Sequence, residues 1–193
     1  MTYDPQQHNR RTIRWEGYDY SQSGGYFITI CASRKRCVFG AINNGVVRLN
    51  HYGRIVKHEW QQSAILRAEI ALDEFVIMPN HFHAIVLLNV GARGGAPNDT
   101  KRSTLTEIGR TAVRPYDAPS HNLGAMINGF KGSVTRHINT YRDEHQLSRV
   151  SVWQRNYYER VIRDENELNA TRRYIIENPL NWASDEYAPQ NQS

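Results

Sequence analysis

Cysteine is scarce in this chain of 193 residues. Cys31 and Cys37 are the only two, so the sequence offers neither a disulfide framework nor a four-ligand zinc site. Long apolar runs are also missing, because the longest clean stretch, residues 84–88, is far shorter than the ~18 residues of a membrane-spanning helix. The polar residues 1–12 are not typical of a signal peptide. These absences favour a reduced, cytoplasmic protein that does not enter a membrane.

Length and charge narrow the choice further. A chain of this length is typical of one compact domain, and 24 Lys and Arg against 19 Asp and Glu give a net charge of +5. This charge favours a polyanionic partner without establishing one. We expect an N-terminal extension at residues 1–24, a main domain at 25–183 and a C-terminal tail at 184–193. Glycine and proline early in residues 90–120 predict a flexible loop inside the domain.

The hydrophobic pattern predicts strands alternating with helices. Two apolar runs flank Pro79-Asn80, which is turn chemistry and indicates adjacent antiparallel strands. Asp164 can cap the last helix, with Glu167 three positions later. The expected strands are residues 26–31, 46–49, 68–78, 81–88 and 150–153, and the expected helices are residues 50–67, 123–141 and 164–178. This order predicts an α+β ferredoxin-like sandwich, with a central antiparallel sheet and helices on one face.

Two histidines share one strand of this expected sheet. Side chains alternate along a strand, so His81 and His83 point the same way, about 7 Å apart at Cα, while Phe82 points to the other face. Two imidazoles on a rigid strand can share a divalent cation, although a third ligand must come from elsewhere. Two partly exposed histidines without a metal would give the same short pattern.

A second candidate pair lies on the last helix. Tyr174 and Asn178 are four residues apart, so they share one helix face. The Asn178 amide oxygen suits Mg²⁺ or Mn²⁺, and the Tyr174 phenol is a weak nucleophile that needs activation of itself or its target. A packing tyrosine and a helix-ending asparagine would fit the same spacing.

Both pairs lie in motifs that resemble one enzyme superfamily. Residues 78–86, MPNHFHAIV, resemble the HUH-motif strand of the single-tyrosine HUH endonucleases. Residues 152–163, VWQRNYYERVIR, followed by YIIENP at 174–179, resemble the C-terminal half of REP-associated tyrosine transposases, relatives of small insertion-sequence transposases. The resemblance covers about residues 20–182, and the two motifs together are far more specific than either alone.

The resemblance implies a role for each matched residue. His81 and His83 match the histidine ligands, Asn178 matches the third protein ligand, and Tyr174 on the C-terminal helix matches the nucleophile. The implied enzyme is a transposase-like endonuclease and strand transferase of mobile elements, which forms a 5′-phosphotyrosine with single-stranded, hairpin DNA. The implied cofactor is Mg²⁺ or Mn²⁺, although imidazole ligands alone would also allow Zn²⁺. A monomer is expected over a homodimer, as in REP-associated relatives.

Other interpretations of these residues remain open. Tyr157 and Tyr158 are rival nucleophiles, ranked below Tyr174 because no ligand-type residue lies one helical turn away. A non-catalytic DNA-binding regulatory protein of the same fold is the main alternative. A metal hydrolase that activates water is another, but it needs a carboxylate near the histidines, and Asp73 and Glu74 lie at the other end of the preceding strand.

Basic residues occur close to both motifs. Lys and Arg contribute affinity for phosphates that does not depend on base sequence. The residues expected to contact DNA are Arg34, Lys35, Lys131, Arg155, Arg163 and Arg173.

Overall fold

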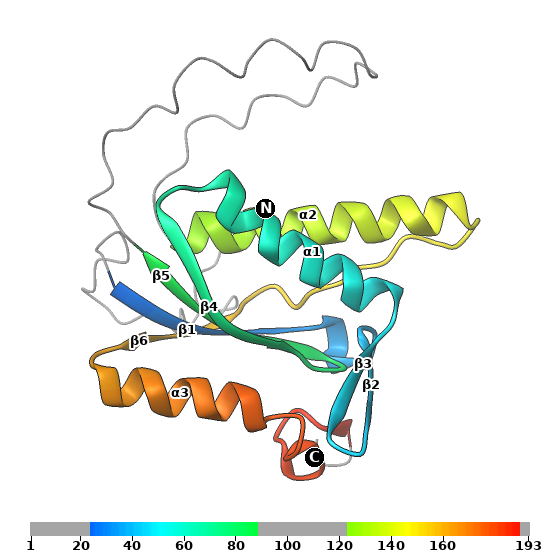
Figure 1. Ribbon diagram of the computed structural model, residues 1–193. Helices are drawn as coiled ribbons and strands as arrows, with labels where there is room; N and C mark the ends of the chain where they lie inside the picture. Colours follow the sequence, from blue (N-terminus) through cyan, green and yellow to red (C-terminus); the bar gives the residue numbers. More distant parts are fainter. Residues whose placement is uncertain (1–23, 89–122, 190–193) are drawn as a thin grey trace, which may run out of the picture.

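The computed structural model describes residues 24–88 and 123–189 and shows a four-stranded antiparallel sheet with helices on both sides (Figure 1). The helices α1 (His51–Leu66) and α2 (Leu123–Glu144) cover one face, and α3 (Glu165–Glu177) lies against the other. The strand order is β4-β5-β1-β6, made by β1 (Gly24–Cys31), β4 (Ile70–Ile77), β5 (His81–Leu88) and β6 (Tyr158–Ile162). This is the ferredoxin-like arrangement, so the predicted α+β fold class with its antiparallel sheet is confirmed. The expectation that helices cover only one face is wrong, because α3 packs on the face opposite α1 and α2 through Ile175.

The larger part of the core lies between the sheet and the pair α1 and α2. Phe82 points into this layer and is fully buried, with its ring 4.8 Å from Trp60 of α1 and 5.5 Å from Phe130 of α2. A smaller cluster on the opposite face joins Phe27 and Ile85 to Ile175 of α3. The sheet is therefore covered on both faces, and α3 is fixed to the side toward which the residues flanking Phe82 point.

Two strand expectations need correction. The strand expected at residues 150–153 is wrong, since only Trp153 forms an isolated bridge to Ala32, and the fourth strand is β6 instead. The structure also contains a hairpin of β2 (Gly40–Asn43) and β3 (Val46–Leu49). The sequence pattern predicted the strand at residues 46–49 but not the strand that pairs with it. The turn of this hairpin is Asn44-Gly45, and both residues have positive φ, as this tight hairpin turn requires.

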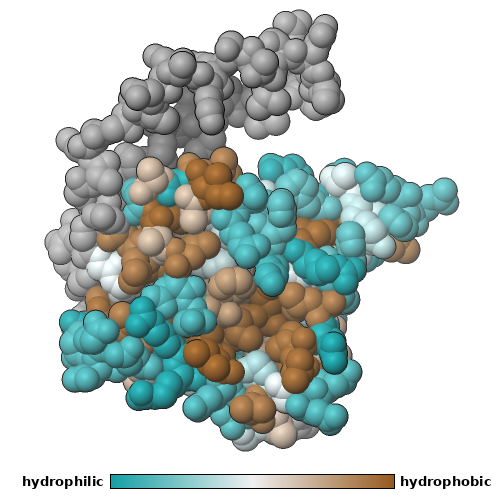
Figure 2. Space-filling view, viewed as in Figure 1, coloured by the Kyte–Doolittle hydropathy of each residue, from teal (hydrophilic) through white to brown (hydrophobic). Residues whose placement is uncertain are grey.

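Other expectations lie outside the described residues. The N-terminal extension through residue 23, the loop at residues 90–120 and the tail beyond residue 189 belong to this group. Within the described ranges, no helix has the length and apolar character needed to cross a bilayer. Figure 2 shows hydrophilic side chains over α3 and apolar surface between the two helical layers.

Replacement of Phe82 by alanine tests the assignment of this residue to the core. We expect Phe82→Ala to lower the free energy of unfolding by about 3–5 kcal/mol, because it empties the space between Trp60 and Phe130. Urea denaturation measures the loss. Leu147→Ala, at a residue that is 46% exposed, is the matched control and should change stability by less than about 0.5 kcal/mol. Equal losses in the two variants would contradict the assignment.

Candidate active site

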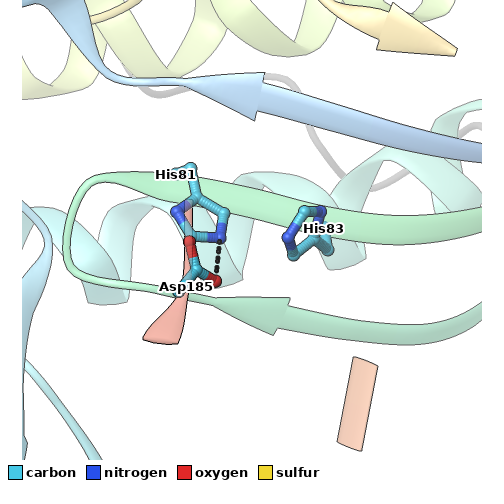
Figure 3. Close-up of side chains that lie close together, drawn as sticks. All are labelled: His81, His83 and Asp185. Atoms are coloured by element: carbon cyan, nitrogen blue, oxygen red, sulfur yellow. Dashed lines mark ion pairs between the residues drawn. The ribbon is translucent and has the colours of Figure 1, made fainter. Parts of the chain in front are cut away.

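His81 and His83 lie side by side on β5 (Figure 3). They point to the face of the sheet that carries α3, because a residue of α3, Tyr174, contacts His83. The ladder between β1 and β5 pairs Cys31 with His81 and Thr29 with His83, so these side chains form two rows on one face. The two imidazole rings are 4.5 Å apart. The alternation in the sequence correctly predicted the shared face. The alternative of two partly exposed histidines does not hold, because both side chains are almost fully buried.

Each imidazole has a polar partner at its Nδ1 atom. His83 Nδ1 lies 2.8 Å from Thr29 Oγ1, and His81 Nδ1 lies 2.9 Å from Asn80 Oδ1. Contacts of this kind fix ring orientation and leave Nε2 available as a metal ligand. Neither Thr29 nor Asn80 was predicted from the sequence as part of the site. The pairing of β1 with β5 could have indicated Thr29, whereas Asn80 has the appearance of an ordinary turn residue.

Burial keeps both imidazoles neutral in the absence of a cation. Desolvation lowers the pKa of His83 from 6.5 to about 3. Desolvation, helped by the neighbouring His83 and by the charge of Lys35, lowers the pKa of His81 to about 2, although the Asn178 amide acts in the opposite direction. A neutral imidazole is the form that binds a metal ion.

Two contacts fix α3 over these histidines. Ile175 is buried against Phe27 and Ile85 of the sheet. Arg172 forms a bidentate ion pair with Asp73 of β4, with Nε 2.8 Å from Oδ1 and Nη2 2.5 Å from Oδ2. The helix begins where the sequence predicts, since the Asp164 side chain accepts a hydrogen bond from the Glu167 N–H.

This docking brings Tyr174 to the histidine pair. The Tyr174 hydroxyl lies 3.4 Å from His83 Nε2, and the ring packs edge-on against Phe27. The side chain is 45% exposed, so the phenol is open to solvent on one side. Burial of the rest, together with the charges of Asp185 and Glu186, raises the pKa of Tyr174, so the phenol is protonated at neutral pH.

Asn178 and Asp185 complete a cluster of acceptors. The Asn178 side chain is buried one turn after Tyr174. Its amide acts to raise the pKa of His81 and to lower the pKa of Tyr174 and of Asp185, so it lies close to all three groups. Within the described part of the chain, its Oδ1 atom and His81 Nε2 are buried without a hydrogen-bond partner. Buried acceptors that face one another are costly unless a cation or a donor lies between them.

The donor set fits a divalent cation. One ligand atom from each of His81, His83 and Asp185 lies within 4.8 Å of the other two. His81 Nε2 is 3.9 Å from Asp185 Oδ2 (Figure 3), a spacing that one ion with ligand distances of about 2.1 Å can bridge. Burial raises the pKa of Asp185. These three side chains therefore form a cluster that could hold a metal ion, with the Asn178 oxygen beside it.

The segment after α3 supplies residues that the sequence did not reveal. It returns to the sheet through a short 3-10 turn, η3 (Trp182–Ser184), and brings Asp185 and Tyr187 to the histidines, within the region expected to be a tail. The Tyr187 ring is 4.7 Å from that of His81. No local motif marks Asp185, because its position depends on the path of the chain beyond Pro179. Asp185 supplies the carboxylate near the histidines that a metal hydrolase would need. Asp73, considered for this role in the sequence, forms an ion pair with Arg172 instead.

The predicted basic residues occupy different environments. Lys131 donates to the carbonyls of Gln154 and Arg155, so its ammonium group supports the chain before β6. Lys35 lies beside the site, with Nζ 5.3 Å from the Tyr187 ring centroid. The remaining predicted residues are exposed; they are Arg34, Arg155, Arg163 and Arg173.

The rival tyrosines lie farther away along the sheet. Tyr158 pairs with Thr29, so its side chain points to the same face as His83, but β1 separates the two strands. Tyr157 packs partly buried against the main core. Of these tyrosines and Tyr174, only Tyr174 has a hydrogen-bond contact with a histidine of the site among the described residues.

The comparisons with known proteins give a relative and a shared fold. An uncharacterized protein of Haemophilus influenzae is 37% identical over 179 residues, which cover 93% of each chain. No protein-family model matches the sequence. A REP-associated tyrosine transposase, solved bound to a REP hairpin, has a similar structure with a TM-score of 0.54 over 86% of this chain and 73% of that one. The two sequences are 16% identical, so this similarity concerns the fold.

The lowered pKa values predict how stability depends on pH. Below about pH 6.5 the unfolded chain binds protons at His81 and His83 that the folded chain does not bind. The folded state is therefore most stable above pH 6.5, where neither state binds a proton at these histidines. Its stability falls as the pH decreases from 6.5 toward 3, because the unfolded state alone gains protons there. We expect the free energy of unfolding of the metal-free protein to fall between pH 6 and pH 5 by up to about 1.4 kcal/mol per histidine. Urea denaturation at pH 7, 6 and 5 measures the slope.

A double variant gives the control for this slope. His81→Gln with His83→Gln should remove most of it, whereas His58→Gln, at a largely exposed residue, should leave it unchanged. A double variant with the slope of the wild type would show that the two imidazoles titrate normally in the folded protein.

Proposed function

The chain belongs to the same protein family as the uncharacterized Haemophilus influenzae protein, and we propose that it is a transposase-like DNA endonuclease and strand transferase. The proposed reaction is the cleavage of single-stranded DNA beside a hairpin by Tyr174, assisted by Mg²⁺ or Mn²⁺. The proposed ligands are His81, His83 and Asn178, with Asp185 as an added carboxylate. We further propose that the protein acts as a monomer.

One observation carries this proposal. Tyr174 and Asn178 lie more than ninety positions after the histidines in the sequence, yet they share one site with them, and the phenol oxygen is 3.4 Å from His83 Nε2. A packing tyrosine and a helix-ending asparagine would not need to converge on two buried, neutral imidazoles. The shared fold with a REP-associated tyrosine transposase supports the same interpretation.

In the proposed reaction the phenol oxygen of Tyr174 attacks the phosphorus of a phosphodiester. A phosphorus–oxygen bond to the tyrosine forms as the bond to the 3′ oxygen of the preceding nucleotide breaks. The phenol loses its proton and the 3′ oxygen gains one, so the products are a 5′-phosphotyrosine and a free 3′-hydroxyl. The raised pKa of Tyr174 means that the phenol starts protonated, so the phosphodiester has to be activated.

The cluster of His81, His83, Asp185 and Asn178 supports a bound cation as the proposed source of this activation. His81, His83 and Asp185 would hold the cation, with the buried Asn178 oxygen as the fourth donor. A divalent ion bound there would polarise a phosphodiester oxygen and neutralise charge that develops on it. Histidine with amide and carboxylate oxygens forms a mixed set that Mn²⁺ and Mg²⁺ accept. The phenol, exposed on one side, leaves room for a DNA strand next to this cluster.

A hairpin is the proposed DNA substrate. The REP-associated tyrosine transposase of similar fold was solved with a REP hairpin bound. This chain carries two exposed arginines, Arg34 and Arg155, close to the end of β1 that adjoins His81. Arg173 directly precedes Tyr174 on α3. Cations at these places would add affinity for the phosphates of a DNA strand bound at the site.

Asp185 also supports a second candidate function. A His-His-Asp cluster could activate water and hydrolyse a phosphodiester without a protein adduct. A denaturing gel of protein, Mn²⁺ and a labelled hairpin oligonucleotide separates the possibilities. A band that combines protein and DNA supports the transposase-like reaction, free cleaved DNA supports the hydrolase, and binding without cleavage supports the non-catalytic regulatory protein.

Substitution of the nucleophile tests the proposal directly. We expect Tyr174→Phe to abolish the covalent protein–DNA band, because it removes the attacking oxygen and leaves the ring packed against Phe27. Tyr158→Phe is the matched control on the same face of the sheet and should retain the band. A covalent adduct in Tyr174→Phe, mapped by mass spectrometry to Tyr187 or another residue, would contradict the assignment.

The basic residues divide into DNA contacts and structural groups. Arg173→Gln should weaken hairpin binding and reduce the slope of log affinity against log salt by about one, because one phosphate contact is lost. Fluorescence anisotropy at several salt concentrations measures this. Arg149→Gln removes the same charge from an arginine that is paired with Asp143 and follows α2, so it should leave the slope unchanged. Identical slopes in all three proteins would remove Arg173 from the interface.

A further inference from the structure

Asn80 occupies the turn between β4 and β5, directly before His81, and is fully buried. Both the NH₂ group and the oxygen of its side-chain amide have hydrogen-bond partners. Nδ2 donates to the carbonyl of Lys35 at 3.0 Å and to the carbonyl of Tyr187 at 2.6 Å, and Oδ1 lies 2.9 Å from His81 Nδ1. One amide therefore joins three segments that lie far apart in the sequence.

These contacts fix the orientation of the amide. Two carbonyl oxygens can accept only from the NH₂ group, so the Asn80 oxygen must face His81. An amide oxygen can only accept, and His81 Nδ1 must therefore carry the hydrogen. It follows that Nε2, on the side of Asp185, has the free lone pair that a metal ion requires.

The same amide holds an unfavourable backbone in place. Arg34 and Lys35, in the short turn η1 (Ser33–Lys35), both have positive φ, at 56° and 49°. Residues other than glycine adopt this conformation only where their surroundings enforce it. The bond from Asn80 to the Lys35 carbonyl is such a constraint, and the Lys35 ammonium lies over the ring of Tyr187, whose carbonyl the amide also binds.

We propose that Asn80 is the positioning residue of this site: it sets the tautomer of His81 and ties η1 and the segment around Tyr187 to β5. The inference rests on the proposed function in that it assigns His81 as a metal ligand. Asn80 itself does not contact DNA or a metal ion in this role. It acts by presenting Nε2 of His81 and by keeping Lys35 and Asp185 beside it.

The tautomer can be measured in the metal-free protein. Long-range ¹H–¹⁵N spectra of histidine-labelled protein distinguish a hydrogen on Nδ1 from one on Nε2, and His81→Gln identifies the signals of His81. We expect the Nδ1–H form in the wild type and a mixture of the two forms in Asn80→Ala. Hydrogen exchange of residues 33–36 and 185–188 should become at least about tenfold faster in this variant, because both carbonyl tethers are lost.

A second variant separates the two roles of the amide. Asn80→Asp keeps an acceptor for the His81 Nδ1–H but loses both donors. It should therefore retain the Nδ1–H tautomer while the exchange of residues 33–36 and 185–188 rises as in Asn80→Ala. If neither variant folds, the tautomer of His81 in the wild type still tests the inference, because an Nε2–H form there would overturn it.

Affinity for Mn²⁺, measured by titration calorimetry without DNA, gives an independent measurement. Asn80→Ala should bind Mn²⁺ about 10- to 100-fold more weakly than the wild type. Asn139→Ala is the matched control, because Asn139 also ties a loop through its amide, to the N–H and carbonyl of Val150, but away from the histidines. This control should keep the affinity and the His81 tautomer of the wild type.

The outcomes distinguish this inference from the proposed function. An unchanged His81 tautomer in Asn80→Ala, or equal losses of Mn²⁺ affinity in Asn139→Ala, would overturn the inference while leaving the Tyr174 reaction standing. A wild type that forms no covalent DNA adduct would overturn the proposed function, and the tautomer and exchange measurements would still decide the role of Asn80. Unchanged exchange in both Asn80 variants would also overturn the inference.

Discussion

The antiparallel ladder between β1 and β5 is the constraint on which the rest of the structure depends. Its register places Phe82 in the core and His81 and His83 on the opposite face, in rows with Cys31 and Thr29. A shift of one residue would turn both imidazoles toward α1 and α2 and expose the aromatic core. The energy that fixes the position of the site therefore comes from packing on the other side of the sheet, around Trp60.

The site gathers acceptors that stabilise the fold poorly by themselves. His81 Nε2 and the Asn178 oxygen are buried without hydrogen-bond partners in the described chain, and the Asp185 carboxylate faces the imidazole at 3.9 Å. Burial lowers the pKa of both histidines and raises that of Asp185, so every group in the cluster is driven toward neutrality. Structures retain such arrangements where a ligand repays the cost, and here the donor set matches a divalent cation.

The sequence predicts what is encoded by local periodicity and misses what depends on the path of the chain. Alternation along the strand predicted that His81 and His83 share one face of the sheet. Helical spacing predicted that Tyr174 and Asn178 share one face of the last helix, so each half of the site could be recognised in the sequence. The strand β6 was missed because an edge strand tolerates charged residues, whereas residues 150–153 alternate but form only one bridge. Asp185 was missed because nothing in its surroundings marks a ligand until the chain turns back beyond α3.

The position of α3 also bears on how many chains form one site. In this structure the helix that carries Tyr174 lies over the histidines of its own chain, held by the buried Ile175 and by the ion pair between Arg172 and Asp73. The segment that follows the same helix supplies Asp185 to the same cluster. In a site that took its tyrosine from a second copy, the same ion pair and the same cover of Phe27 and Ile85 would form between chains instead of within one. In this structure the proposed nucleophile and the proposed ligands all come from one chain, and this observation is the basis for proposing that the protein acts as a monomer.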